Sequence, residues 1–168
     1  MQPLTSERGT TLIETMVALT VLLIAMSGLM TLAGLSSRTT ENNGHLAART
    51  AEDAQDKMEQ LLALSYGDNS SNTAVFPATN TAGTGLAIGG SVNPATPVDG
   101  YVDWLAADGS LLGGGTAPPA TWFYERVWQV TQFSTTVKLI SITVTTKWAF
   151  GKANLPMSTV AAFKSNGF

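Results

Sequence analysis

The feature that most constrains this chain is a long apolar run near its start, Thr10 to Leu35, which contains a single charged residue, Glu14. The run has roughly 26 residues, and a helix of that length is about 39 Å long, enough to cross the hydrocarbon core of a bilayer. A carboxylate in hydrocarbon costs roughly 3 kcal/mol or more, so it is seldom kept there without a partner. The sequence therefore predicts a membrane helix in which Glu14 requires a partner.

Two common kinds of segment explain this run less well. A cleaved secretory signal would have a shorter apolar core behind a basic start, but the prefix MQPLTSERG holds a single cation. An ordinary membrane anchor would explain the length and the hydropathy, but it predicts no acid close to its end. Neither accounts for Glu14.

The order of residues at the start of the run resembles the class III signal of type IV pilins and type II secretion pseudopilins. Arg8 and Gly9 are followed by the sequence TTLIE. In this family a membrane-embedded prepilin peptidase cuts after the glycine, so the resemblance implies a leader of residues 1–9 and a mature N-terminus at Thr10. Glu14 then takes the fifth mature position, where the family keeps a glutamate. Thr10 would also be the site of N-methylation, and it stands where the family usually has phenylalanine, methionine or leucine.

The resemblance also implies a partner for Glu14. The new α-amine of Thr10, in the same or a neighbouring subunit, is a cation, and pairing with it in low dielectric recovers part of the desolvation cost. In the family this pair sets the axial register when a subunit leaves the bilayer and enters a filament. Gly28 and Gly34 fit two interpretations, a looser helix or close packing against neighbouring helices. The residues expected to pack neighbouring helices together are Leu12, Ile13, Met16, Val17, Leu19, Leu22 and Leu23.

Beyond Leu35 the apolar pattern narrows to one stripe, which predicts that the helix continues to about Leu64. We therefore divide the helix into a transmembrane or filament-core half, 10–35, and an amphipathic half, 36–64. Asn42-Asn43-Gly44 is its weak point, where a kink or break would divide the helix without changing its role. The segment AARTAEDAQDKMEQLLAL also resembles the corresponding helix of PilV-like minor pilins and GspI-like minor pseudopilins. The stripe consists of Ala47, Ala51, Ala54, Met58, Leu61 and Leu62, and the charged residues mostly off it are Arg49, Glu52, Asp53, Asp56, Lys57 and Glu59.

Residues 65–121 are rich in glycine, serine, threonine, asparagine and proline, which predicts a variable loop region with short strands. A minor hairpin is expected where 100–105 and 110–112 flank the turn sequence Ala107-Asp108-Gly109. The three glycines at 113–115 indicate a flexible turn, because no lysine follows them as a phosphate loop requires.

Residues 122–168 predict an antiparallel sheet. Trp122 to Gln132 and Val137 to Trp148 form a hairpin signature, and a third strand is expected around Met157 to Phe163. Alternation places Arg126 on the side of Tyr124, Trp128 and Val130, with its stem over the sheet edge. The second strand has a buried face of Ile140, Ile142, Val144 and Trp148, and a solvent face of Ser141, Thr143, Thr145 and Lys147. The sequence thus predicts an α+β fold, type IV pilin-like, with a long N-terminal hydrophobic helix packed on a C-terminal antiparallel β-sheet head.

No catalytic or ligand site emerges from the composition. The absence of cysteine excludes disulfides and thiolate chemistry, and the single histidine, His45, leaves a catalytic triad poorly supplied. Asp99, Asp103 and Asp108 lack the dense oxygen spacing of a calcium loop. The net charge of −3 without a basic run makes nucleic acid an unlikely partner. We expect no enzyme activity, no cofactor and no metal.

The sequence therefore predicts a minor pilin, a structural and assembly subunit. Its expected partners are the prepilin peptidase, the inner membrane and other pilin or pseudopilin subunits. Its expected location is the inner membrane with a periplasmic head, and afterwards a periplasmic or extracellular filament. A major pilin and a type II secretion minor pseudopilin stay open as alternatives, and a tip adhesin or a DNA-uptake receptor is more distant.

Overall fold

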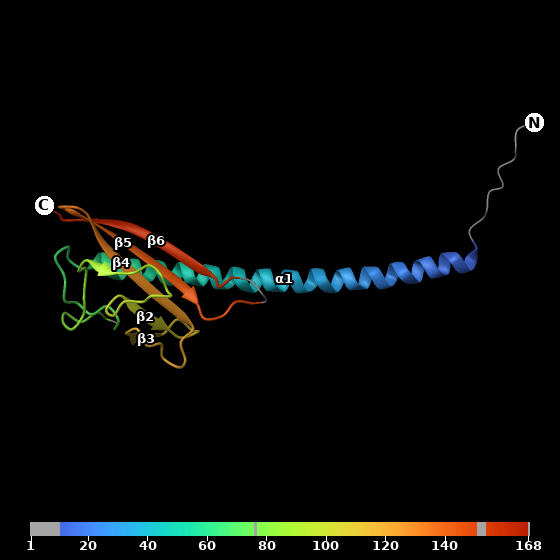
Figure 1. Ribbon diagram of the computed structural model, residues 1–168, viewed down its shortest axis with the longest axis horizontal. Helices are drawn as coiled ribbons and strands as arrows, with labels where there is room; N and C mark the ends of the chain where they lie inside the picture. The colour runs from blue at the N-terminus through green and yellow to red at the C-terminus, as the bar shows by residue number, and fades with distance from the viewer. Residues whose placement is uncertain (1–10, 76, 151–153, 168) are drawn as a thin grey trace, which may run out of the picture. The chain divides into compact units, whose positions relative to one another are not determined.

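The computed structural model describes residues 11–75, 77–150 and 154–167. Within these ranges every strand pair is antiparallel, and the sheet order is β3-β2-β4-β5-β6, with β1 also paired to β4 (Figure 1). The predicted α+β class, one long apolar N-terminal helix and an antiparallel sheet, is confirmed. The elements are α1 (Leu12–Ala63), β1 (Gly89–Gly90), β2 (Val102–Leu105), β3 (Leu111–Gly114), β4 (Tyr124–Ser134), β5 (Val137–Thr146) and β6 (Met157–Ser165).

The helix α1 is continuous for 52 residues, about 78 Å at 1.5 Å of rise per residue. No proline interrupts it, and its ends lie within two residues of the predicted limits, 10 and 64. The chain forms two compact units, Met1–Glu41 and Asn42–Phe168, so the unit boundary falls at the predicted weak point of the helix. The backbone nevertheless stays helical through that point.

Asn43 is held by the connection between β5 and β6. Its side-chain Nδ2 donates to the carbonyl oxygen of Phe150 at 3.0 Å, and its Oδ1 accepts from the Phe150 N–H at 2.9 Å. This pair of hydrogen bonds satisfies the amide and links α1 to a segment more than a hundred positions away. The helix is therefore not broken at Asn42-Asn43-Gly44.

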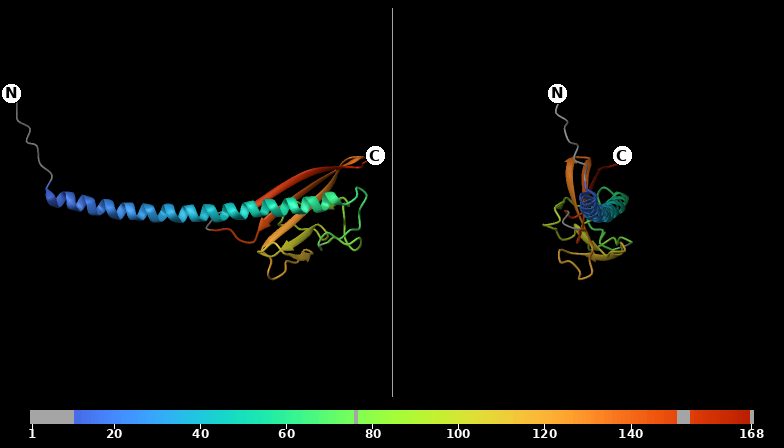
Figure 2. Two further views of the ribbon diagram at one scale, coloured as in Figure 1. Left: turned by 180° about the vertical axis from the view of Figure 1, so that it is seen from behind. Right: turned by 90° about the vertical axis from the view of Figure 1, so that its right-hand side faces the viewer.

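The core of the second unit lies between the C-terminal part of α1 and one face of the sheet. The strands β4, β5 and β6 cross this part of α1 obliquely (Figures 1 and 2). The predicted alternation along β4 and β5 is confirmed for the apolar residues of this cluster, which are buried between the sheet and the helix. The buried residues of this cluster include Ala54, Met58 and Leu61 of α1 and Trp128, Val130, Ile140, Ile142 and Val144 of the sheet.

The sheet differs from the prediction at three residues of its second strand. Trp148 is 62% exposed because β5 ends at Thr146, before the predicted strand end. Thr143 and Thr145, expected to meet solvent, are buried. The outer face of the sheet carries a second apolar cluster, with Val102, Trp104 and Val127 at its centre and Trp122 packed on it, so loops cover that part of the face.

The two predicted hairpins are present. β2 and β3 are joined by a turn in which the Gly109 N–H donates to the Ala106 carbonyl at 3.0 Å, and Gly109 has a φ of 86° that favours glycine. β4 and β5 pair from Tyr124↔Thr146 to Ser134↔Val137. Gly90 of β1 likewise has a φ of 85°, and in addition a Cβ there would lie 2.1 Å from a backbone oxygen of β4.

Candidate membrane and assembly segment

The first half of α1 exposes its apolar side chains. The residues predicted to pack neighbouring helices have exposed fractions between 54% at Leu22 and 80% at Leu12. The most apolar 18-residue window of α1 has a mean hydropathy of 2.2 and no buried residue, so the helix is long and apolar enough to cross a membrane once. Exposed apolar surface of this extent needs cover from lipid or from other chains. The exposed residues predicted for this role are Leu12, Ile13, Met16, Val17, Leu19, Leu22 and Leu23.

The hydroxyl groups in this segment are satisfied inside the helix. Each donates to a backbone carbonyl one turn earlier, Thr15 to Leu12 at 2.8 Å and Thr20 to Met16 at 2.8 Å. Ser27 and Thr31 donate in the same way. A helix in hydrocarbon must satisfy its polar groups internally, and these four residues do so.

Glu14 lies in the first turn of α1, behind a threonine cap. The Glu14 N–H lies 3.0 Å from the Thr11 carbonyl and 3.4 Å from the Thr11 hydroxyl, and the Thr15 N–H donates to the same carbonyl at 3.2 Å. Thr11-x-x-Glu14 has the spacing of a capping box, a signal that the sequence analysis did not use. A negative charge is also favourable at a helix N-terminus.

The carboxylate of Glu14 has no charge partner among the described residues. Within the part of the chain that the structure describes, no ion pair or side-chain hydrogen bond reaches it. The predicted processing site, Gly9 and Thr10, lies outside the described residues, as does Arg8. Cleavage, N-methylation and the charge pair therefore stay predictions.

The second unit contains a buried charge cluster, Lys57, Asp103 and Arg126, which the sequence analysis missed. Lys57 and Asp103 are fully buried and Arg126 is 2% exposed. The Lys57 Nζ lies 2.7 Å from Asp103 Oδ2, and the Arg126 Nε lies 2.7 Å from Asp103 Oδ1. Lys57 Nζ also donates to the carbonyl of Thr73 at 2.7 Å and lies 4.1 Å from the ring centroid of Trp128. Arg126 thus lies under α1 with its charge paired, and not over the sheet edge as expected.

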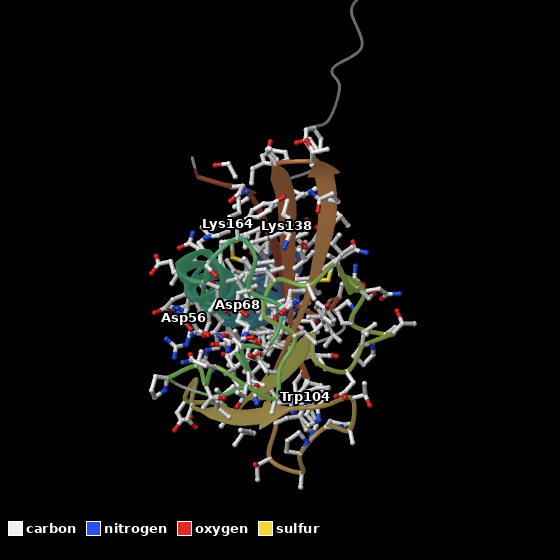
Figure 3. All side chains as sticks on the ribbon, turned by 90° about the vertical axis from the view of Figure 1, so that its left-hand side faces the viewer. Asp56, Asp68, Trp104, Lys138 and Lys164 are labelled. Carbon is white, nitrogen blue, oxygen red and sulfur yellow. The ribbon has the colours of Figure 1, made fainter. Side chains whose placement is uncertain are left out.

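The cluster continues along α1 toward solvent. The Arg126 Nη1 donates to Asp56 Oδ2 at 3.2 Å and to the carbonyl of Asp53 at 3.4 Å. The Asp56 side chain is 60% exposed and lies at the surface beside the helix (Figure 3). Asp53 and Lys57 were predicted off the apolar stripe but are buried, whereas Leu62 was predicted on it and is 37% exposed.

Burial and the neighbouring opposite charges shift the pKa values of these groups in opposite directions. Burial raises the pKa of Asp53 to about 6, against the opposing effects of Arg126 and Arg49. Burial lowers the pKa of Lys57 to about 8, although Asp103 acts to raise it. Burial would raise the pKa of Asp103, but its two cations outweigh that effect and hold its pKa below the usual value. Asp103 is therefore ionised at neutral pH, and its role is to neutralise charge between α1 and the sheet.

Two further lysines secure the chain that follows α1. Lys138 Nζ donates to the carbonyls of Tyr66 and Leu86, both at 2.8 Å, and Lys164 Nζ donates to the carbonyl of Leu62 at 2.5 Å. Cations near the last carbonyls of a helix are favourable. The carboxylate of Asp68 accepts hydrogen bonds in the loop that follows (Figure 3).

The described residues contain no group of three or more His, Cys, Asp or Glu side chains that could hold a metal ion. Asp103, one of the three aspartates considered for calcium, is instead committed to Lys57 and Arg126. Comparison of this chain with protein-family models, with curated proteins and with solved structures finds no match.

Proposed function

We propose that this chain is a type IV pilin-like minor subunit, stored in a membrane through α1, cut after Gly9 and then assembled into a filament or its tip. The observation that carries the proposal is the division of α1 into two chemically different halves. Its first half exposes apolar side chains, and its second half packs on an antiparallel sheet. Fully covering one such side chain stabilises by roughly 1.5–3 kcal/mol, so the seven residues predicted to pack could contribute about 10 kcal/mol or more to insertion or assembly.

Glu14 supports assembly over simple anchoring. In an anchor this carboxylate would serve only the helix N-terminus, at a cost in hydrocarbon, whereas a subunit with a free α-amine at Thr10 also has a cation to pair with it. The cap formed by Thr11 satisfies a backbone donor and leaves the carboxylate of Glu14 available. The same chemistry would serve a type II secretion pseudopilus, so the proposal covers both kinds of filament and favours the pilus.

The processing step is tested by mass spectrometry of the mature N-terminus, with Gly9→Leu as the variant. Glycine has no side chain to obstruct a peptidase, so we expect the wild-type product to begin at Thr10 and the variant to keep residues 1–9. Ser6→Leu is the matched control, because it adds the same side chain to the leader away from the scissile bond. A Gly9→Leu product that still begins at Thr10 would contradict the peptidase assignment.

The assembly step is tested with Glu14→Gln. Glutamine keeps the capping-box spacing and loses only the charge, so we expect normal or easier membrane insertion and at least tenfold less incorporation into sheared filaments. Glu41→Gln makes the same change on the same helix outside the apolar run and should assemble normally. Equal incorporation of Glu14→Gln and wild type would show that the charge is dispensable.

The minor-subunit part of the proposal has its own measurement. Quantitative proteomics of sheared filaments should find this chain as a small fraction of the total subunits. If it is the dominant protein of the filament, the chain is a major pilin, and the minor-subunit assignment is wrong.

A further inference from the structure

The outer face of the sheet, opposite α1, contains an open cavity of about 420 Å³ that Glu125 of β4 helps to line. Glu125 lies between its cross-strand partners Trp104 and Thr145. Thr145 in turn pairs with Met157 of β6, so one row of residues crosses four strands beneath the cavity. The row belongs to regular, paired strands, which gives the cavity a rigid floor.

Glu125 is buried and has no partner for one of its oxygens. The residue is 6% exposed, and its Oε1 has no hydrogen bond to any residue that the structure describes. Burial raises the pKa of Glu125 to about 7, and no charged neighbour contributes to that shift. An unsatisfied buried polar group costs roughly 1–3 kcal/mol, so each one in a native structure calls for an explanation, and a bound ion is one such explanation.

The cation that lines the cavity does not neutralise Glu125. Lys147 lines the same cavity, but its ammonium lies 5.1 Å from the ring centroid of Trp122 and 6.0 Å from that of Trp148. Among the described residues, Lys147 forms no ion pair with Glu125 within 4.0 Å. The other wall residues are uncharged, and they include Pro94, Ala95, Leu155 and Met157.

We propose that this cavity binds a primary alkylammonium group, such as the side chain of a lysine on a partner protein, with Glu125 as its counter-ion. The charge complement of a buried carboxylate is a hydrogen-bond-donating cation. The apolar walls suit the methylene stem of such a side chain. An anion would meet the charge of Glu125, and a metal ion would find one carboxylate where it needs several oxygen ligands. This inference does not depend on the filament assignment.

The test uses the full chain in non-ionic detergent micelles with two soluble probes of similar shape. N-acetyl-lysine methylamide carries the ammonium, and N-acetyl-norleucine methylamide is its neutral counterpart. Binding is followed by NMR of chain labelled with ¹³C at the glutamate carboxyls, where Glu125 is assigned by comparison with Glu125→Gln. We expect the cationic probe to bind at least tenfold more tightly than the neutral one and to lower the pKa of Glu125.

Two variants decide the origin of that preference. Glu125→Gln should bind the two probes equally, and Lys147→Met should keep or strengthen the preference for the cation, because a competing positive charge is removed. Equal binding of both probes to wild type, or an unchanged preference in Glu125→Gln, would overturn the proposal. Failure of the cationic probe to bind wild type would also overturn the proposal. If the cationic probe binds only the Lys147→Met variant, the group that occupies the cavity in wild type is Lys147 itself.

Discussion

Removal of the carboxylate of Asp103 is the sharpest test of how the second unit is held together. Asp103→Asn keeps the size of the side chain and removes the charge that Lys57 and Arg126 share. Three hydrogen bonds end on this carboxylate, from Lys57 Nζ at 2.7 Å and from Arg126 Nε and Nη2 at 2.7 and 2.9 Å. The variant leaves two buried cations facing a neutral amide.

The cost can be divided between the two cations. In the variant Lys57 can become neutral by losing its proton. Its pKa is about 8, so deprotonation at pH 7 costs about 1.4 kcal/mol, which limits the contribution of Lys57 to the loss of unfolding free energy. Arg126 cannot deprotonate and keeps only Asp56 and a backbone carbonyl as partners, so it accounts for about 2–3 kcal/mol more. The total, roughly 3–5 kcal/mol, agrees with the usual cost of breaking a buried ion pair. This is a large share of the 5–15 kcal/mol that typically stabilises a domain.

The assay is urea unfolding of the full chain in non-ionic detergent, followed by tryptophan fluorescence, because Trp128 is fully buried and lies over Lys57. Asp56→Asn is the matched control, since it removes a carboxylate that touches the same arginine but is 60% exposed, and it should cost less than about 1 kcal/mol. A combined Lys57→Met, Asp103→Leu, Arg126→Met variant should recover most of the lost stability. An Asp103→Asn midpoint equal to wild type, or equal losses in Asp103→Asn and Asp56→Asn, would refute the reasoning.

Two further predictions concern the sheet and its link to α1. Because burial raises the pKa of Glu125 from 4.5 to about 7, the folded state holds this proton more tightly than the unfolded chain. The free energy of unfolding should therefore fall by up to about 3 kcal/mol as pH rises from 5 to 8. The urea midpoint of Glu125→Gln should depend much less on pH than that of wild type. The remaining pH dependence is due to Asp53, whose raised pKa of about 6 makes stability fall with rising pH over a lower pH range. Asn43→Ala removes two hydrogen bonds to Phe150, so amide exchange at Phe150 should accelerate roughly fivefold, for about 1 kcal/mol of local stability, while Asn42→Ala leaves it unchanged.

The hydrophobic periodicity predicted the elements of the fold well because apolar spacing dominates where a helix or strand must bury one face. The helix ends, both hairpins and the strand at 157–165 follow from that rule. The core face of β5, with Ile140, Ile142 and Val144, follows from the period of two. Trp148 departs from it because the strand ends early, and Thr143 and Thr145 are buried although they lie on the face opposite the helix.

The charge cluster was missed in the sequence analysis because charged residues were assigned to solvent from their type, although their helical spacing places them on the buried face. Thr50, Asp53, Lys57 and Leu61 recur at intervals of three and four, so the helical period alone places all four against the sheet. A charged residue at such a position is ordinarily assigned to solvent. Its burial depends on Asp103, which is distant in sequence and therefore invisible to a local pattern.

Each half of α1 contains a charged residue that is costly to keep away from water, Glu14 in the first half and Lys57 in the second. Among the described residues only Lys57 has a charge partner, and this difference bears on function. Lys57 is neutralised within its own chain by Asp103, through contacts short enough to hold both groups charged in low dielectric. Glu14 lies in an apolar segment and has no such partner among the described residues. A charge that is paired within the chain stabilises a fold, whereas an unpaired charge of equal cost must be paired by something outside it or by a group created later. Cleavage after Gly9 would create that group at Thr10, so a carboxylate with no charge partner among the described residues is the strongest physical reason to expect assembly from this chain.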